Sequence, residues 1–294
     1  MTNAKTILVT GGTGFLGSHL IELLISQDYS VVILKRSTSN LWRISDLMPF
    51  VKSYDVDLVS PDLAFMENSI DCVIHTACHY GRNVDSTATI SETNLSFGLR
   101  ILDACLKYGT PTFVNTDTSL SKYLNNYTLS KKQFVEWLKQ QSDKINVINL
   151  RLEHIYGPKD DINKFVHWVI SQFEANVPEI SLTKGHQKRD FIYIDDVVAA
   201  YLLVIEKASV LKGFNEYDVG TGTLMEVKVF LELLKDVYQK NLGNTTSKLL
   251  FGAVPYRDGE MMTVKVDNSG LVALGWKPAI SVKQGLQNLI KGYL

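Results

Sequence analysis

Residues 7–17 of the chain read Ile7-Leu8-Val9-Thr10-Gly11-Gly12-Thr13-Gly14-Phe15-Leu16-Gly17. An apolar, strand-like run leads directly into a glycine-rich turn, and an amphipathic helical pattern follows. Glycines at this spacing let the chain turn sharply, bring backbone N–H groups close to a phosphate, and let the helix pack against the strand. The unpaired N–H groups and dipole of the helix N-terminus then favour an anion. The stretch therefore predicts a turn that binds a dinucleotide pyrophosphate. The residues expected to contact it are Gly11, Thr13, Gly14, Phe15, Leu16 and Gly17.

Strand-like and helical runs alternate on both sides of this turn. The strand-like runs cover residues 6–10, 31–34, 71–75, 112–115 and 146–150, and helical spacing of apolar residues covers 17–27, 90–107 and 131–141. This alternation favours an α/β fold with a Rossmann-type, doubly wound parallel sheet and helices on both faces. After Gly157-Pro158 the pattern changes to helical segments mixed with short strands. We therefore expect a smaller C-terminal, substrate-binding lobe.

The composition excludes several other classes of protein. The 294 residues carry 30 Lys+Arg and 31 Asp+Glu with no basic stripe, so nucleic acid is not an expected partner. The longest apolar runs are strand-sized, which predicts no membrane helix. The first five residues lead straight into a strand, which leaves no room for a signal peptide and favours a cytoplasmic location. The three cysteines are scattered, and the histidines lack metal-ligand spacing, so we expect neither a disulfide framework nor a metal.

The end of the second strand-like run bears on the choice of dinucleotide. A protein that binds NAD usually has an acid here for the ribose 2′-hydroxyl, whereas this chain has Lys35-Arg36. A guanidinium can hold a 2′-phosphate through paired hydrogen bonds. We interpret the pair as a preference for NADPH, with an ordinary basic loop as the alternative. Asp57-Leu58 falls where a side chain could reach the adenine edge.

A second motif, Tyr127-Thr128-Leu129-Ser130-Lys131, opens a later helical run. Tyr127 and Lys131 are four positions apart, so both would lie on one face of a helix. The ordinary pKa of a phenol is near 10, and a nearby ammonium makes the phenol usable near neutral pH. The segment Thr116-Asp117-Thr118, at the end of the preceding strand, could direct a hydroxyl at the same substrate oxygen. The motifs together predict nicotinamide-dependent chemistry at a carbonyl or alcohol carbon.

With these motifs the sequence resembles the extended short-chain dehydrogenase/reductases, in particular the nucleotide-sugar epimerase/dehydratase/reductase group. Further matching segments are Asp71-Cys72-Val73-Ile74-His75-Thr76-Ala77, Thr93-Asn94, Arg151-Leu152-Glu153-His154-Ile155-Tyr156-Gly157-Pro158, Arg189-Asp190-Phe191-Ile192-Tyr193-Ile194-Asp195-Asp196-Val197 and Leu274-Gly275-Trp276-Lys277-Pro278. The resemblance implies that Tyr127 is the general acid/base, that Lys131 holds the nicotinamide ribose, and that Thr118 hydrogen-bonds the reacting oxygen. It also implies that Thr76 and Ala77 lie over the cofactor.

The resemblance also implies a substrate. Arg189 and Arg257 would meet the diphosphate or nucleotide of a nucleotide-linked sugar. Where the group's 4,6-dehydratases follow the catalytic Thr with Asp-Glu, this chain has Ser119-Leu120. Thr118 and Tyr127 are nine positions apart, a shorter spacing than in typical epimerases. His154 stands where many members have Asn, and the segment containing His79, Tyr80 and Arg82 is placed to line the sugar pocket.

These departures resemble the 4-ketoreductases of deoxysugar biosynthesis, such as CDP-abequose and CDP-paratose synthases. The implied activity is NADPH-dependent reduction of a nucleotide-linked 4-keto-6-deoxysugar (possibly a 3,6-dideoxysugar) for surface polysaccharide or O-antigen precursors. An NAD-dependent nucleotide-sugar 4-epimerase and a catalytically silent dinucleotide sensor remain alternatives. We expect residues 1–155 plus about 186–220 to form the NADP-binding domain, and about 156–185 plus 221–294 the nucleotide-sugar-binding lobe. By analogy, the helices near 90–107 and 127–141 would form a homodimer.

Overall fold

A computed structural model of the chain describes residues 5–81, 85–243 and 245–293, and its centre is a parallel sheet of seven strands. The strand order is β10-β6-β5-β4-β1-β2-β3, and each neighbouring pair is parallel. The strands are β1 (Thr6–Thr10), β2 (Ser30–Lys35), β3 (Val51–Asp55), β4 (Cys72–His75), β5 (Thr112–Thr118), β6 (Asn146–Leu152) and β10 (Phe214–Val219). The predicted α/β fold of the Rossmann type is therefore confirmed.

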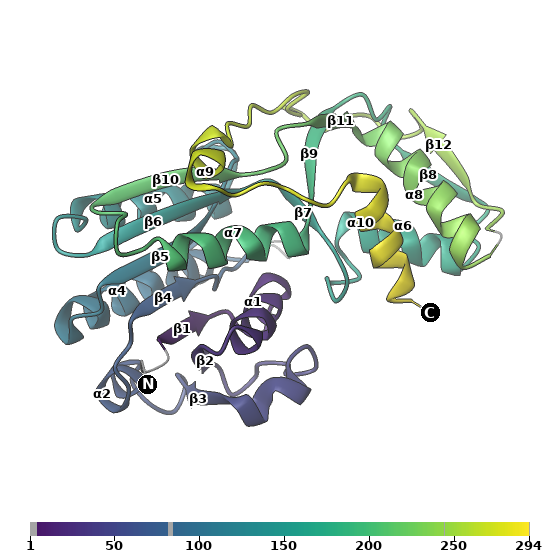
Figure 1. Cartoon of the computed structure of the whole chain (residues 1–294). Helices are drawn as coiled ribbons and strands as arrows, with labels where there is room; N and C mark the ends of the chain where they lie inside the picture. Colours follow the sequence, from purple (N-terminus) through teal and green to yellow (C-terminus); the bar gives the residue numbers. More distant parts are fainter. Residues whose placement is uncertain (1–4, 82–84, 244, 294) are drawn as a thin grey trace. The chain divides into compact units, whose positions relative to one another are not determined.

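Helices cover both faces of this sheet (Figure 1). One face carries α2 (Asp62–Glu67), α4 (Phe97–Tyr108) and α5 (Asn126–Gln140), and the other carries α1 (Phe15–Ser26) and the part of α7 (Ile194–Glu206) from Val198 on. Between the sheet and the helices α2, α4 and α5 lies a buried apolar cluster that includes Leu8, Val73 and Phe113 of the sheet and Phe134 of α5. Strands buried on both faces explain the continuous apolar runs in the sequence.

The predicted helix over residues 90–107 is interrupted. Three consecutive pieces occupy it: α3 (Thr87–Ser91), a π-helical turn η2 (Glu92–Ser96) and then α4. A π turn inserts one extra residue into a helix and is frequent at functional sites. Apolar spacing does not reveal such an insertion, because each flanking piece keeps its own helical period.

The chain folds as two compact units: Met1–Leu152 with Val198–Val219, and Glu153–Val197 with Gly220–Leu294. The sequence predicts that residues about 186–220 belong to the first unit, whereas the structure groups 186–197 with the second. The reason is β9 (Lys188–Tyr193), which pairs with β7 (His154–Tyr156) and β11 (Leu224–Glu226) in a separate three-stranded sheet. The two partners of β9 in this sheet, β7 and β11, have three residues each, too few for a clear alternating pattern.

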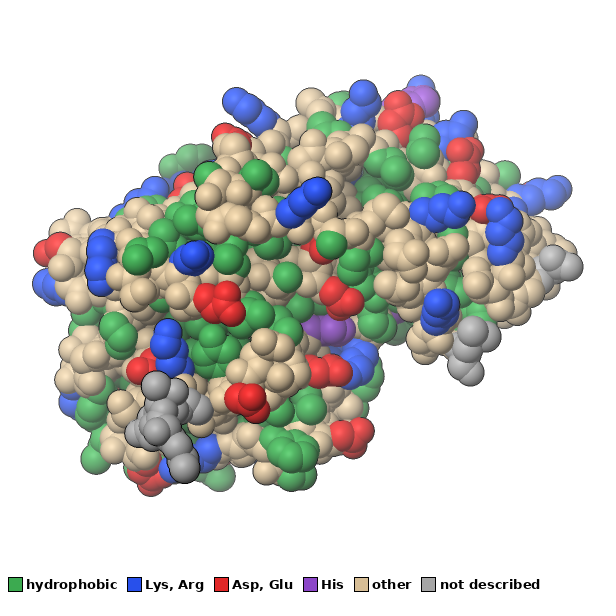
Figure 2. Space-filling model, in the orientation of Figure 1, with side chains coloured by type: hydrophobic (Ala, Val, Ile, Leu, Met, Phe, Trp, Pro, Cys, Tyr) green, Lys and Arg blue, Asp and Glu red, His purple; other side chains and the backbone are tan. Residues whose placement is uncertain are grey.

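The second unit also contains a two-stranded sheet, β8 (Glu179–Leu182) with β12 (Lys248–Phe251). Its remaining helices are α6 (Phe165–Glu174), α8 (Val227–Asn241), α9 (Ser269–Leu274) and α10 (Val282–Lys291). Buried Asp196 ties this unit together, because its carboxylate accepts hydrogen bonds from Ala279 N and Ile280 N at 2.9 and 3.0 Å. Among the described residues, no helix is both long and apolar enough to span a membrane. On the face drawn in Figure 2, Lys and Arg side chains are interspersed with Asp and Glu.

Candidate active site

The glycine turn leaves no room for side chains. Gly11 has φ +70°, and a Cβ there would lie 2.6 Å from Ala77 N. A Cβ on Gly17 would lie 2.2 Å from Gly11 O, a distance at which backbone would have to move. No side chain caps the start of α1 in the described part of the chain, so its first amides remain available to an anion. The turn therefore leaves its backbone amides open to a phosphate and has no space for side chains. A dinucleotide pyrophosphate needs a binding site of this kind.

The loop after β4 is fastened to the end of β1. Thr76 Oγ1 donates to Thr10 O at 2.7 Å, and Ala77 N donates to Thr10 Oγ1 at 3.4 Å. The Thr10 hydroxyl also bonds His75 Nδ1 at 2.8 Å. Burial, together with the nearby Lys131 charge, lowers the pKa of His75 to about 3, so this imidazole stays neutral. The bonds place Thr76 and Ala77 beside the glycine turn.

At the end of β2, the two predicted 2′-phosphate residues differ in their surroundings. Lys35 Nζ is 3.2 Å from Asp55 Oδ2, and the same carboxylate oxygen accepts a hydrogen bond from Ser37 Oγ at 2.9 Å. The Arg36 side chain is exposed and makes no hydrogen bond or ion pair with any described residue. Asp57 Oδ2 accepts from Ser37 N at 2.9 Å. This end of the site therefore combines one free guanidinium with two acids.

Leu58, predicted to lie at the adenine edge, is 76 % exposed. A residue that the sequence reasoning missed lies closer to the glycine turn. Arg43, in the loop after β2, is buried, and its Nη1 donates to Thr13 O at 3.4 Å. Its guanidinium carbon lies 4.6 Å from the ring centre of Trp42. The only signal in the sequence is a Trp-Arg pair within a polar loop, which is too common to single out.

The start of α5 is fixed by a capping box. Asn125 Oδ1 accepts from Thr128 N at 2.9 Å, and Thr128 Oγ1 accepts from Asn125 N at 3.1 Å. The box places Tyr127 in the first helical turn, where the helix dipole favours negative charge on its oxygen. The Tyr127 side chain hydrogen-bonds that of Thr118 at the end of β5. Thr116 is not in this arrangement, because its hydroxyl bonds Tyr201 OH at 2.7 Å.

Burial acts on both members of the Tyr-Lys motif. It raises the pKa of the Tyr127 phenol, and nearby Cys78 and Asp117 add to the rise, while the hydrogen bond from Thr118 lowers it. It lowers the pKa of Lys131, a residue that is only 2 % exposed. Among the described residues, Lys131 has no hydrogen-bond or ion-pair partner. A buried ammonium without a protein partner is expected where a ligand supplies one, and ribose hydroxyls fit that need.

Asn94, in the π turn, holds the loop that carries His79 and Tyr80. Its Oδ1 accepts from His79 N at 2.6 Å, while its Nδ2 donates to His79 O at 2.9 Å and to Ser130 Oγ at 3.0 Å. The Tyr80 ring lies 5.1 Å from the Tyr127 ring, centre to centre. Both predicted sugar-pocket residues of this loop are thus near the Tyr-Lys motif, and the third, Arg82, lies outside the described residues.

The other predicted substrate residues belong to the second unit. His154 is in β7, where its ring packs on Phe191 and its Nδ1 lies 3.7 Å from Glu153 Oε2. Arg189, in β9, forms an ion pair with Glu260, and its Nη1 donates to Lys188 O at 2.8 Å. Arg257 is exposed. Arg189 is therefore held by a carboxylate that an incoming diphosphate would have to displace.

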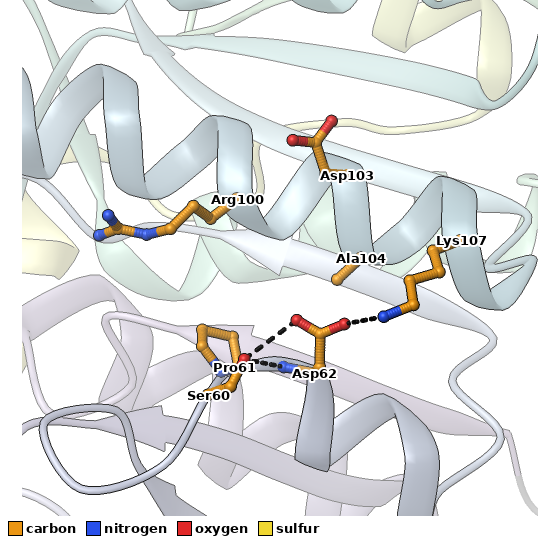
Figure 3. Close-up of a pocket in the computed structure, with 7 residues that line it drawn as sticks. All are labelled: Ser60, Pro61, Asp62, Arg100, Asp103, Ala104 and Lys107. Carbon is orange, nitrogen blue, oxygen red and sulfur yellow. Dashed lines mark hydrogen bonds and ion pairs between the residues drawn. The ribbon is translucent and has the colours of Figure 1, made fainter.

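Figure 3 shows a pocket of about 200 Å³ between α2 and α4. Its lining charges are largely neutralised within the protein, since Lys107 Nζ lies 2.7 Å from Asp62 Oδ1 and Arg100 Nη2 lies 2.8 Å from Glu92 Oε1. It contains none of the residues predicted for the site. In the part of the chain that the structure describes, no cluster of three or more His, Cys, Asp or Glu residues could hold a metal ion.

The first unit combines a Rossmann-type sheet, a glycine turn, and Thr118 at the end of β5 near Tyr127 and Lys131 of α5. This combination is typical of a dinucleotide-dependent short-chain dehydrogenase/reductase. The chain belongs to the NAD dependent epimerase/dehydratase family, whose model matches residues 7–220. It is thus a nucleotide-sugar-modifying enzyme that uses a nicotinamide dinucleotide. The family resemblance predicted from the sequence is confirmed.

Three relatives illustrate this similarity. The chain is 34 % identical to a CDP-abequose synthase of Salmonella typhimurium over 297 residues, which cover 97 % of each chain. It is 26 % identical to a putative UDP-glucose 4-epimerase of Methanocaldococcus jannaschii, again over 97 % of each chain. A solved UDP-glucose 4-epimerase of Thermotoga maritima with UDP-glucose superposes with a TM-score of 0.83 at 24 % identity and covers 98 % of each chain. The last comparison supports the fold alone.

Proposed function

We propose that the enzyme reduces the C4 keto group of a nucleotide-linked 4-keto-6-deoxysugar or 3,6-dideoxysugar with NADPH. The observation that carries this proposal is the hydrogen-bonded Thr118–Tyr127 pair with no elimination acid beside it. The 34 % identity with a CDP-abequose synthase over almost the whole chain supports the same substrate class. Surface-polysaccharide precursor synthesis is the corresponding setting.

Thr118, Tyr127 and Lys131 would each have a separate role in reduction of the carbonyl group. Reduced nicotinamide, when bound, supplies hydride to the keto carbon. Tyr127 donates its phenolic proton to the oxygen that becomes the alcohol, and Thr118 hydrogen-bonds the same oxygen and orients it. Lys131 brings a buried positive charge to the site, which stabilises the phenolate left after proton transfer. A phenol whose pKa is raised by burial is protonated at neutral pH, the form that a proton donor needs.

A dehydratase is disfavoured by the residues after β5. Water elimination needs a carboxylic acid close to the catalytic Thr, and positions 119 and 120 are Ser and Leu. Asp117, the residue before Thr118, has a fully buried side chain whose Oδ2 lies 2.6 Å from Lys132 Nζ. An acid committed to a salt bridge on the sheet cannot exchange protons freely with a sugar.

The cofactor would be held by the elements that the structure brings together. The amides of the glycine turn would bind the pyrophosphate, Lys131 the nicotinamide ribose, and Thr76 and Ala77 the dinucleotide beside them. Arg36 is the group available to a 2′-phosphate. Asp57 and Leu58 would approach the adenine edge. In the second unit, Arg189, Arg257 and His154 are the proposed contacts for the nucleotide sugar, with His79 and Tyr80 as contacts from the first.

One observation favours a second candidate, an NAD-dependent nucleotide-sugar 4-epimerase. Lys35 and Asp55 neutralise each other, which leaves Asp57 as an acid without an ion-pair partner among the described residues at the adenosine end. An acid there suits the free 2′-hydroxyl of NAD and repels a 2′-phosphate. The same Tyr127 and Lys131 would serve an epimerase.

The test follows NADPH oxidation at the nicotinamide absorbance with CDP-, dTDP- and GDP-linked 4-keto-6-deoxysugars, with NADH in parallel. We expect rapid NADPH loss with one sugar, which also identifies the base. If neither cofactor is oxidised with any sugar, the reductase proposal fails. Purified enzyme that carries bound NAD and interconverts C4 epimers, with no net cofactor use, would establish the second candidate instead.

We also propose that the enzyme is a homodimer through residues 90–107 and 127–141. The Trp137 side chain on α5 is 50 % exposed, which is a large apolar surface for a helix face. Light scattering after size exclusion is expected to give twice the mass of the chain, and Trp137→Glu is expected to give the single mass. A wild-type monomer at micromolar concentration would contradict this arrangement.

A further inference from the structure

A buried carboxylate without a hydrogen-bond donor lies at the start of β7. The Glu153 side chain has no exposed surface, and neither of its carboxylate oxygens has a hydrogen-bond partner among the described residues. Its Oε2 lies 3.7 Å from His154 Nδ1, a nitrogen that is also buried and has no hydrogen bond in the described part of the chain. Two unsatisfied polar groups therefore face each other, slightly beyond hydrogen-bond distance.

The neighbouring acid, Asp190, has the donors that Glu153 lacks. Its Oδ1 accepts from Thr221 N and Thr221 Oγ1 at 2.9 and 2.8 Å, and its Oδ2 accepts from Gly222 N at 2.7 Å. A Cβ on Gly220 would lie 2.9 Å from both Asp190 Oδ2 and Glu153 Cγ, so the two acids lie against the same glycine. Burial raises the pKa of the Asp190 carboxyl, and the charge of Glu153 raises it further. Asp190 thus adds repulsion to Glu153 and gives it no hydrogen bond.

An imidazolium at His154 would be the counterion that Glu153 needs. Burial strongly disfavours a carboxylate charge unless a cation pairs with it. A protonated imidazole donates through both nitrogens, so Nδ1 can serve Glu153 while Nε2 serves a ligand. The His154 side chain is 40 % exposed although its Nδ1 is buried, so its exposed surface lies on the rest of the ring. Glu153 holds one edge of this ring, and the other edge is open.

The strand beside His154 indicates which ligand would meet that open edge. His154 is paired with Phe191 in the parallel ladder of β7 and β9, and the two ring centres lie 6.0 Å apart. Arg189 precedes Phe191 by two residues on β9, so its side chain points to the same face of the sheet. A guanidinium and an imidazolium on one face are typical of a site for a diphosphate.

We propose that Glu153 is a positioning residue that holds His154 by Nδ1 and stabilises its imidazolium, so that the ring takes up a proton at Nε2 when it binds the diphosphate of the nucleotide sugar. This inference rests on the proposed function, which supplies the nucleotide-linked substrate. The proton comes from solvent, and carboxylate, imidazolium and phosphate then alternate in charge. Glu153 acts through His154 and does not touch the substrate.

The other charged groups around His154 are already engaged. They are Asp190 and Arg189 of β9 and Glu260 of the loop before α9. Arg189 and Glu260 form an ion pair with each other, and Asp190 is held by the loop after β10. On the far side of Phe191, α8 contributes the apolar ring of Phe230, stacked at 3.8 Å. The charge of Glu153 is therefore the one that His154 can neutralise.

The experiment is titration calorimetry of the full chain with CDP-, dTDP- and GDP-glucose, whose diphosphates do not ionise between pH 6 and 8.5. Two buffers with different heats of ionisation give the number of protons taken up. For the sugar that binds most tightly, we expect uptake to rise from near zero at pH 6 to about 0.5 proton or more at pH 8.5, where an unbound imidazole is mostly neutral. By linkage, the affinity should fall about fourfold between pH 7 and 8.5.

Variants separate the two residues of the pair. Glu153→Met should remove most of the uptake at pH 8.5, and His154→Gln should remove all of it and make the affinity independent of pH. The matched control is Glu226→Gln, because Glu226 lies 3.3 Å from His186 in an exposed His–Glu pair of the same unit. We expect this variant to behave as the wild type.

A second readout needs no ligand. In ¹⁵N-histidine NMR, assigned with His154→Gln, the neutral His154 ring should carry its proton on Nδ1, facing Glu153. In Glu153→Met that buried nitrogen has no acceptor, so the proton should move to Nε2, which water can reach. If Glu153 only filled space, the tautomer would stay the same.

Equal proton uptake in the wild type and Glu153→Met, or an unchanged tautomer, would overturn the inference. Failure of all three nucleotide sugars to bind, or an equal loss of uptake in Glu226→Gln, would do the same. If Glu153→Met does not fold, His154→Gln decides, because an affinity that still falls with pH in that variant contradicts the role of the ring. Calorimetry measures binding without turnover, so failure of the reductase proposal is seen separately.

Discussion

Replacing Lys131 by Met is expected to stabilise the protein while it abolishes activity. Lys131 is 2 % exposed, burial lowers its pKa, and no described residue pairs with its ammonium. An unpaired buried charge costs several kcal/mol, and a Met of similar length removes that cost without leaving a large cavity. We expect a gain of about 2 kcal/mol in the free energy of unfolding at pH 7. At about 2–4 °C per kcal/mol for a unit of this size, Tm should rise by roughly 4–8 °C.

The gain in stability from Lys131→Met should decrease as the pH rises. Because the folded pKa of Lys131 lies below the unfolded value of about 10.4, the wild type is penalised wherever its ammonium stays charged in the folded state. The penalty decreases as pH rises from the folded pKa towards about 10.4 and is absent above it. The difference in Tm between the two proteins should therefore shrink at alkaline pH.

The assay is calorimetry of the cofactor-free wild type, Lys131→Met and the control Lys139→Met between pH 6 and 10.5. Lys139 is exposed on the same helix, so its replacement should change stability by less than about 0.5 kcal/mol. Turnover of Lys131→Met should fall by about 10²-fold or more, as for loss of a charge that stabilises the transition state. A Lys131→Met protein that is less stable than the wild type, or a Tm difference that is constant with pH, would refute the reasoning.

Four further predictions concern single residues. Tyr127→Phe should lower kcat by about 10²–10⁴-fold, because the proton donor is lost. The Kd for NADPH, measured by nucleotide fluorescence, should stay within about twofold of the wild type. Retained turnover would contradict the role of Tyr127 as the proton donor. Gly17→Ala should cost about 2–4 kcal/mol in urea unfolding and weaken NADPH binding, since its Cβ would lie 2.2 Å from a backbone oxygen. Arg36→Ala should weaken NADPH about 10- to 100-fold in the same fluorescence titration and leave NADH unchanged, and an equal loss for both nucleotides would place its side chain elsewhere. Because its folded pKa is about 3 against an ordinary 6.5, the ring resonances of His75 should not titrate in NMR between pH 5 and 8, and stability should fall as pH drops from 6.5 towards 3.

Much of the first unit could be predicted from sequence because its signals are local. A glycine turn after a buried strand has few structural solutions, and the spacing of Tyr127 and Lys131 needs only one helical turn. The start of α5 at Asn126 is set by a capping box of Asn125 and Thr128, which the predicted helical spacing over 131–141 did not include. Signals of this kind involve residues close in sequence, so they can be recognised without knowledge of the rest of the fold.

What could not be predicted depends on contacts between distant segments. The pairing of Lys35 with Asp55 links the ends of two parallel strands whose register no motif reports. The Arg189–Glu260 pair joins residues 71 positions apart. The row of hydrogen bonds from Asp117 through Asn149 to Glu216 appears only once three strands lie side by side. From the sequence alone, each of these charged residues could bind a ligand. Only the structure shows which of them already form ion pairs within the protein.

The π turn has a consequence for how the site can diversify. Asn94 uses three hydrogen bonds to join the loop at His79 to Ser130, one residue before Lys131. An Asp would lose both donors and a Gln would be one methylene too long, so this position has almost no freedom. The fastened loop, in contrast, presents Tyr80 beside Tyr127 with nearly half of its surface exposed. Under the proposed function, mutations at Tyr80 can therefore change the choice of sugar while α5 stays in place, which separates the evolution of substrate choice from that of the chemistry.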